Sequence, residues 1–264
     1  MANKLKYSFD DYIKNPSGRG SAVNTSVDKL QYDKELLSLE GNNGKATYTV
    51  YKQGRTGGVY YYIIHFAIPS STKGFFHDVV IEFNPDQLDN VSVKSIKAYT
   101  VKFFVNDENF VYTYAYAFKT HGLLISELER LLPFRSITQK APTRNPDNAM
   151  GYNKQLVYAY LIMQRHNLFS KDILNRICNN TGYNVIRQKI EPYDKKVQER
   201  RKLTQKEKEA ADKARHDKSN TTKIVKSKNL LGNSLPTPPK LTTIVNQVKS
   251  VSKIGTVKKK PKKH

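Results

Sequence analysis

The sequence predicts an α+β domain in which an antiparallel sheet of about four strands is followed by a helical C-terminal half and a long, basic, flexible tail. Strand-like segments crowd the first half at short spacing, with no helical pattern between them. After Asn106 the spacing of apolar residues changes from that of strands to that of helices. Beyond Lys195 the chain has no Phe, Tyr or Trp, so it lacks the large apolar side chains whose burial repays the entropy of ordering.

Four segments have the β-branched and aromatic composition of strands. A glycine-rich turn joins the first two, which predicts a hairpin, and an Asn-Pro-Asp turn follows the third. A helix is expected before the sheet, where apolar residues at roughly helical spacing follow Ser26, a suitable cap. These elements are a helix over 26–37 and strands over 46–51, 59–68, 75–83 and 96–105.

The helical half begins with a segment that allows two interpretations. Asp107 can cap a helix whose face carries Phe110, Tyr114 and Phe118, but the tyrosines at every second position from 112 to 116 would also suit a strand. We adopt the helix. The remaining expected elements are helices over 125–132, 147–167 and 171–178 and a loop over 135–146.

The net charge of the chain changes at the same position, near Lys195, as its content of large apolar residues. Residues 195–264 contain 21 basic and 5 acidic side chains, a net charge of +16, whereas the first 194 residues carry +6. We therefore expect an N-terminal arm over 1–25, an α+β domain over 26–190 and a largely disordered or extended basic tail over 191–264. Any helix over 195–218 would be solvated and marginal, because that segment has no apolar stripe.

Composition also bears on where the protein works. A single cysteine, Cys178, excludes an internal disulfide framework and suits a reducing compartment. The first residues contain no apolar signal core, and the longest apolar run, 60–68, is too short to span a bilayer. We expect a protein that is not secreted and has no membrane partner.

No motif predicts catalysis. Gly41-Asn-Asn-Gly-Lys45 lacks the glycine spacing and the Ser/Thr of a phosphate loop. His65 and His77 are expected to be ordinary sheet histidines, because a metal site needs a third convergent ligand. Asp78 and Glu82 share a strand face, as paired nuclease carboxylates would, but Asn84 replaces the lysine that such a site needs. We expect no enzyme activity, metal, cofactor or small-molecule substrate.

The basic tail is the most informative feature. Lysines on a flexible segment neutralise phosphates and release counterions, which gives salt-dependent binding without sequence preference. The tail has no aromatic residue on which a base could stack, so it would bind the nucleic-acid backbone. The candidate nucleic-acid-binding residues are Arg200, Arg201, Lys202, Lys258, Lys259, Lys260, Lys262 and Lys263.

A second feature of the tail suggests protein docking. After a proline-rich spacer over 234–239, five apolar residues follow at a spacing that would place them on one helix face. Their β-branched content would equally suit strand addition to a sheet edge. The candidate docking patch, 241–251, contains Leu241, Ile244, Val245, Val248 and Val251.

Several strings in the chain resemble a family of structural proteins of tailed bacteriophages. They lie at 7–23 (Tyr-Ser-Phe-Asp-Asp-Tyr-Ile-Lys-Asn-Pro-Ser-Gly-x-Gly-Ser-Ala-Val), 76–83, 101–113 and 145–163. The resemblance covers roughly residues 5–180, and the family also tends to end in lysines. It implies a virion or assembly role and transfers no catalytic residue.

Together these observations predict a bacteriophage virion structural or assembly protein, a capsid (head), portal-vertex or neck component. It would reside in the virion and, during assembly, in the host bacterial cytoplasm. Its partners would be other virion proteins, copies of itself in an oligomer, and packaged DNA, and its tail would contact DNA or clasp a neighbouring subunit. The alternative is an intracellular accessory protein that binds nucleic acid without sequence preference.

Overall fold

A computed structural model describes residues 7–14, 29–54, 60–85, 94–179 and 182–228, with side chains as far as Arg215. Four strands form one antiparallel sheet in the order β1-β2-β3-β4. Helices follow the sheet in the chain, so the predicted α+β class is confirmed. The strands are β1 (Thr47–Gly54), β2 (Tyr60–Pro69), β3 (Phe76–Asn84) and β4 (Thr100–Val105).

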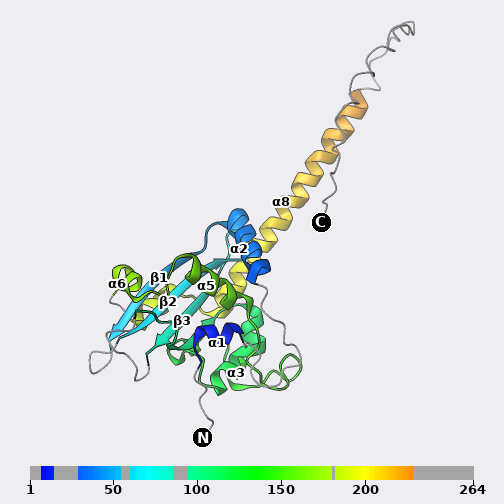
Figure 1. The fold of residues 1–264 in the computed structure, drawn as a ribbon. Helices are drawn as coiled ribbons and strands as arrows, with labels where there is room; N and C mark the ends of the chain where they lie inside the picture. Colours follow the sequence, from blue (N-terminus) through cyan, green and yellow to red (C-terminus); the bar gives the residue numbers. More distant parts are fainter. Residues whose placement is uncertain (1–6, 15–28, 55–59, 86–93, 180–181, 229–264) are drawn as a thin grey trace, which may run out of the picture. The chain divides into compact units, whose positions relative to one another are not determined.

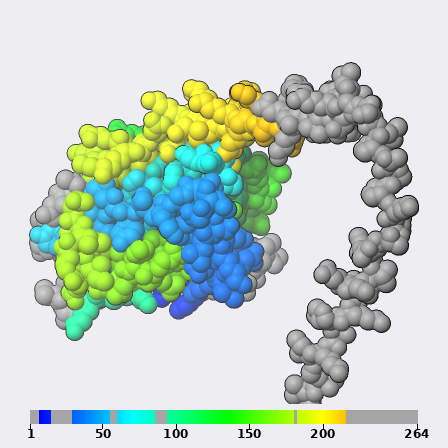
Figure 2. Space-filling view, turned by 90° about the horizontal axis from the view of Figure 1, so that it is seen from above, coloured from blue at the N-terminus to red at the C-terminus, as the bar shows by residue number. Residues whose placement is uncertain are grey.

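The sheet separates two layers of helices (Figure 1). On one face Phe83 and Phe103 pack against Phe9 of α1 (Phe9–Lys14), which also contacts Tyr160 of α5 (Lys154–Arg165). Helix α2 (Lys29–Asn43) packs against α5. On the other face α7 (Tyr183–Lys189) and the start of α8 (Tyr193–Lys228) contact the buried carboxylates of β3. In Figure 2 these yellow residues form a layer along one side of the molecule.

Helix α1 lies within the segment 1–25, which we expected to be an N-terminal arm. Ser8 and Asp11 form a reciprocal capping box, in which the Asp11 N–H donates to Ser8 Oγ at 3.1 Å and the Ser8 N–H donates to Asp11 Oδ2 at 3.3 Å. Phe9 and Tyr12 are buried, at 0% and 1% exposed. Part of the predicted N-terminal arm therefore belongs to the core.

The helical half keeps the expected order with different boundaries. The helix expected after Asp107 is formed by η1 (Phe110–Tyr114), a π-helix, and by α3 (Ala115–Thr120). Helix α5 begins seven residues later than the expected start at 147, because Asn153 caps it by accepting hydrogen bonds from the N–H groups of Gln155 and Leu156. The remaining elements are η2 (Ser126–Leu131), α4 (Phe134–Thr138, within the expected loop) and α6 (Lys171–Ile177).

The expectation for residues 191–264 needs a correction over its first part. Residues Tyr193–Lys228 form one helix, α8, and the compact unit that contains the sheet extends to Ala211. Composition concealed this docking because the face that meets the sheet carries Lys196 and Arg200 in place of aliphatic residues. The Lys196 ammonium and the Arg200 guanidinium lie over the ring of Phe75, with Nζ and Cζ 5.3 Å and 5.9 Å from the ring centroid, and both groups also meet polar partners. Residues 229–264, with the docking patch, lie outside the described residues.

Candidate functional site

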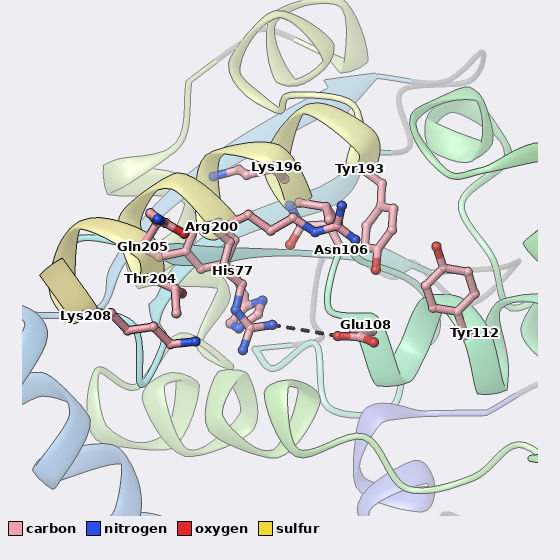
Figure 3. Close-up of a pocket in the computed structure, with 13 residues that line it drawn as sticks. His77, Asn106, Glu108, Tyr112, Tyr193, Lys196, Arg200, Thr204, Gln205 and Lys208 are labelled. Carbon is pink, nitrogen blue, oxygen red and sulfur yellow. Dashed lines mark ion pairs between the residues drawn. The ribbon is translucent and has the colours of Figure 1, made fainter.

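A pocket of about 660 Å³ lies where the first turns of α8 meet the beginning of β3 and the chain after β4 (Figure 3). One wall is the docked face of α8, and the opposite side comes from β3, from Asn106 and from η1. Its lining residues are Phe75, His77, Asn106, Glu108, Tyr112, Tyr193, Lys196, Val197, Arg200, Arg201, Thr204, Gln205 and Lys208.

Three contacts fix α8 beside the pocket. Tyr193, which is 3% exposed, packs edge-to-face on Tyr112 with ring centroids 5.7 Å apart. Lys196 Nζ donates to the carbonyl oxygen of Phe76 at 3.3 Å. About three turns further on, Glu207 Oε1 accepts the backbone N–H of Lys73 at 2.8 Å. The basic side chains of these turns therefore start from a backbone that the domain holds in place.

Behind the pocket, Asp78 is an ionised carboxylate with several polar partners. Its Oδ1 lies 2.9 Å from His65 Nε2, and its Oδ2 accepts a hydrogen bond from Asn106 Nδ2 at 2.7 Å. Lys196 Nζ lies 3.4 Å from the same Oδ2. Burial raises the pKa of Asp78, but the hydrogen bond and charge of His65, the charge of Lys196 and the amide of Asn106 outweigh burial and lower the pKa overall. Asp78 thereby orients Lys196 at the pocket.

His77, the next residue along β3, has the opposite electrostatic character. It is 7% exposed, and burial lowers its pKa to about 4, with Arg200 and Lys196 acting in the same direction against Asp107 and Asp78. Its ring lies edge-to-face on Phe75 at 5.2 Å. Within the described part of the chain, Nδ1 has no hydrogen-bond partner. A neutral imidazole with unused hydrogen-bonding capacity therefore lines the pocket at neutral pH.

The pocket lining is electropositive. It contains Lys196, Arg200, Arg201 and Lys208 against the single carboxylate of Glu108, a formal charge of +3 with His77 neutral. Arg200 Nη1 lies 3.9 Å from Glu108 Oε2, and the Glu108 side chain is 61% exposed, so water screens this long pair. The charge of Arg200 is therefore weakly compensated.

Two of the predicted nucleic-acid-binding residues, Arg200 and Arg201, line this pocket. Lys202 follows them on α8, is exposed and lies outside the pocket lining. The other predicted site residues lie beyond the described residues; these are Lys258, Lys259, Lys260, Lys262, Lys263, Leu241, Ile244, Val245, Val248 and Val251.

Sequence reasoning did not identify Lys196, His77 and Tyr112 as parts of one site. The predicted strand placed His77 at the start of β3, but no local pattern indicated that a helix more than 100 residues later would cover it. The spacing of Tyr193, Lys196, Arg200 and Glu207 on α8 is a signal that could have been used, since these residues recur on one helix face.

The carboxylates considered for a nuclease have separate structural partners. Glu82 accepts the hydroxyl of Tyr183 and forms an ion pair with Lys102 at 3.3 Å. Burial, followed by the charge of Glu82, raises the pKa of Tyr183. Among the residues that the structure describes, no group of three or more His, Cys, Asp and Glu side chains could hold a metal ion. Over the same residues, no helix combines the length and the apolar character needed to cross a membrane.

The fold and the pocket define an α+β protein with a basic helix docked on its sheet. Comparisons with protein families, with curated proteins and with solved structures found no match to this chain.

Proposed function

We propose that this protein is a non-enzymatic structural or assembly protein of a tailed bacteriophage particle that binds nucleic acid through its basic C-terminal region. The binding is to the phosphate backbone and has no sequence preference. Its partners are other virion proteins, further copies of the chain and packaged DNA, and it resides in the virion and in the bacterial cytoplasm during assembly.

The nucleic-acid part of this proposal is supported by the attachment of α8 to the folded domain. The helix starts in the folded domain, held by Tyr193, Lys196 and Glu207, and begins the segment that carries most of the chain's positive charge. Lys202 and Lys206 are exposed on it. The first basic side chains of this segment therefore start from a backbone that the domain holds in place, where they can meet a polyanion.

The particle role is supported by the resemblance at 7–23, 76–83, 101–113 and 145–163. The polar groups considered for catalysis support a non-enzymatic role, because Asp78 and Glu82 are each occupied by partners within the fold.

Binding of the full chain to two duplex DNAs of unrelated sequence tests the nucleic-acid part. We expect equal affinities for the two duplexes and a loss of binding by about 10³ or more between low and moderate salt, because several phosphate contacts are replaced by counterions. Fluorescence anisotropy with labelled duplexes gives both quantities. The proposal would be contradicted by affinities that differ strongly between the duplexes, or by an affinity that does not change with salt concentration.

The alternative, an intracellular accessory protein, makes the same binding prediction and differs in location. Mass spectrometry of purified particles separates the two. The particle role predicts peptides of this chain at a copy number comparable to other minor structural proteins. Their absence from particles, with duplex binding intact, would favour the accessory role.

A further inference from the structure

We propose that the pocket between α8 and the start of β3 is a binding site for the phosphate group of a nucleotide, with Tyr112 providing a ring surface for the base. This site uses the basic residues of α8 that line the pocket and is distinct from Lys202, Lys206 and the charged segment that follows, and it does not depend on the function proposed above.

The positive charges of the pocket lining are only partly compensated by acidic groups within the described residues. Arg201 and Lys208 are exposed, and no ion pair is recorded for either within the described residues. Arg200 has only its long, exposed pair with Glu108. The lining thus keeps a surplus of positive charge in a concave site, where fewer water molecules screen it than on open surface. A dianionic phosphate group is the common biological ligand that neutralises such a surplus.

Two basic groups of the pocket are held in place by contacts within the protein. Lys196 is 17% exposed, and its ammonium is held between Asp78 and the carbonyl oxygen of Phe76, so its position at the pocket is set before a ligand arrives. The guanidinium of Arg200 lies over the Phe75 ring at 5.9 Å, which restricts its stem. Figure 3 shows the guanidinium of Arg200 beside His77, with Lys196 one turn earlier on α8. Lys196 and Arg200 therefore lose less side-chain entropy on binding than unrestrained side chains would.

His77 contributes a polar ring to a site that already carries excess positive charge. Because it is buried and neutral at neutral pH, it can hydrogen bond to a ligand without adding a further buried cation. Its unpartnered Nδ1 is the kind of buried polar group that native proteins usually pair. A ligand, or a water molecule held by that ligand, would supply the hydrogen-bond partner for Nδ1 that the described residues do not provide.

Tyr112 identifies the class of phosphate carrier. Its side chain is 46% exposed at the rim, although its ring is braced edge-to-face by Tyr193. An exposed aromatic ring beside a phosphate-binding cluster is the arrangement by which proteins hold unpaired nucleotides, since every base has a face that can stack. A volume of about 660 Å³ is ample for one nucleotide.

Titration calorimetry with the full chain tests the proposal, with adenosine 5′-monophosphate, inorganic phosphate and adenosine as probes. We expect saturable binding of the nucleotide, weaker binding of phosphate and none of adenosine. Arg200→Gln should weaken nucleotide binding by about tenfold or more, because a charge-assisted contact is lost. Arg200→Lys should recover part of the affinity. Lys195→Gln is the matched control, because it removes one charge from an exposed position on α8 outside the pocket lining.

The variant Tyr112→Leu tests the ring surface for the base separately from the phosphate-binding part of the site. It should lower the affinity for the nucleotide and leave that for inorganic phosphate unchanged. Competition by a single-stranded oligothymidylate distinguishes the source of the phosphate: displacement of the nucleotide indicates a strand, and no displacement indicates a free nucleotide. Both outcomes support a phosphate pocket.

Two results would overturn the inference. One is the absence of saturable binding of the nucleotide and of phosphate up to about 10 mM, which is too weak for a built site. The other is an equal loss in Arg200→Gln and Lys195→Gln, which would mean that only general charge matters. If the pocket does not bind the nucleotide, the prediction of salt-dependent duplex binding is unaffected. If duplex binding is absent in a chain that still binds the nucleotide, only the proposed function is refuted.

Discussion

His77 and Asp78 are adjacent in the chain but differ in charge because β3 directs them to different surroundings. Asp78 is buried and remains ionised, since His65, Lys196 and Asn106 stabilise its carboxylate. His77 is buried against Phe75 and is kept neutral, with Lys196 and Arg200 opposing a further positive charge. Protonating His77 in the folded state is therefore unfavourable.

This difference predicts a pH dependence of stability. The folded-state pKa of His77 is about 4 and its unfolded value is 6.5, so the unfolded chain binds the proton more readily. The stability is fully present above the unfolded pKa and is lost as pH falls toward the folded pKa. Between pH 7.5 and about pH 5, the free energy of unfolding should fall by about 2 kcal/mol more in the wild type than in His77→Gln. Urea denaturation at both pH values measures this, and identical pH dependences would refute it.

Whether a residue-level feature could be predicted depends on how far apart in the sequence the interacting residues lie. The alternation of β3 placed Asp78 and Glu82 on one face, and they are on one face, but Tyr183 and Lys196 reach them from more than 100 positions away. A carboxylate's partners determine whether it is structural or reactive. Sequence spacing within a strand does not contain that information.

Among the elements, α8 differs most from expectation. It docks through a mixed face in which Tyr193 is buried, Lys196 and Arg200 are half-buried over Phe75, and Glu207 accepts a backbone N–H. A search for an aliphatic stripe misses such a face, since part of its contact with the domain is made by charged groups that lie over an aromatic ring. Strands β1 to β4 were easier to predict because β-branched and aromatic residues are concentrated in them.

Tyr193→Ala tests whether that docking holds the helix. Tyr193 closes the first turn of α8 against Tyr112, so its removal should release the first turns and raise amide hydrogen exchange over 196–208 by about tenfold or more. The amides of β2 and β3 should be much less affected. Hydrogen exchange read by mass spectrometry gives both, with Lys195→Ala as the exposed control on the same helix. Equal protection in Tyr193→Ala and the control would contradict the docking role.

At the scale of the whole molecule, the α+β domain and the basic segment have separable chemistry. The domain buries its apolar residues in one cluster that includes both faces of the sheet. The basic segment begins on α8 and contains most of the net charge of +22. Composition alone located this change in charge, whereas the point at which packing ends had to come from tertiary contacts, which place the end of the compact unit at Ala211.

The salt dependence of duplex binding tests the central claim most directly. Full-length wild type should be compared with a variant in which Lys258, Lys259, Lys260, Lys262 and Lys263 are replaced by Gln. If each lysine neutralises one phosphate, the slope of log K against log salt should become shallower by about 4 to 5 in the variant. An unchanged slope, or the absence of duplex binding by the wild type at low salt, would contradict the claim that the basic C-terminal region binds nucleic acid.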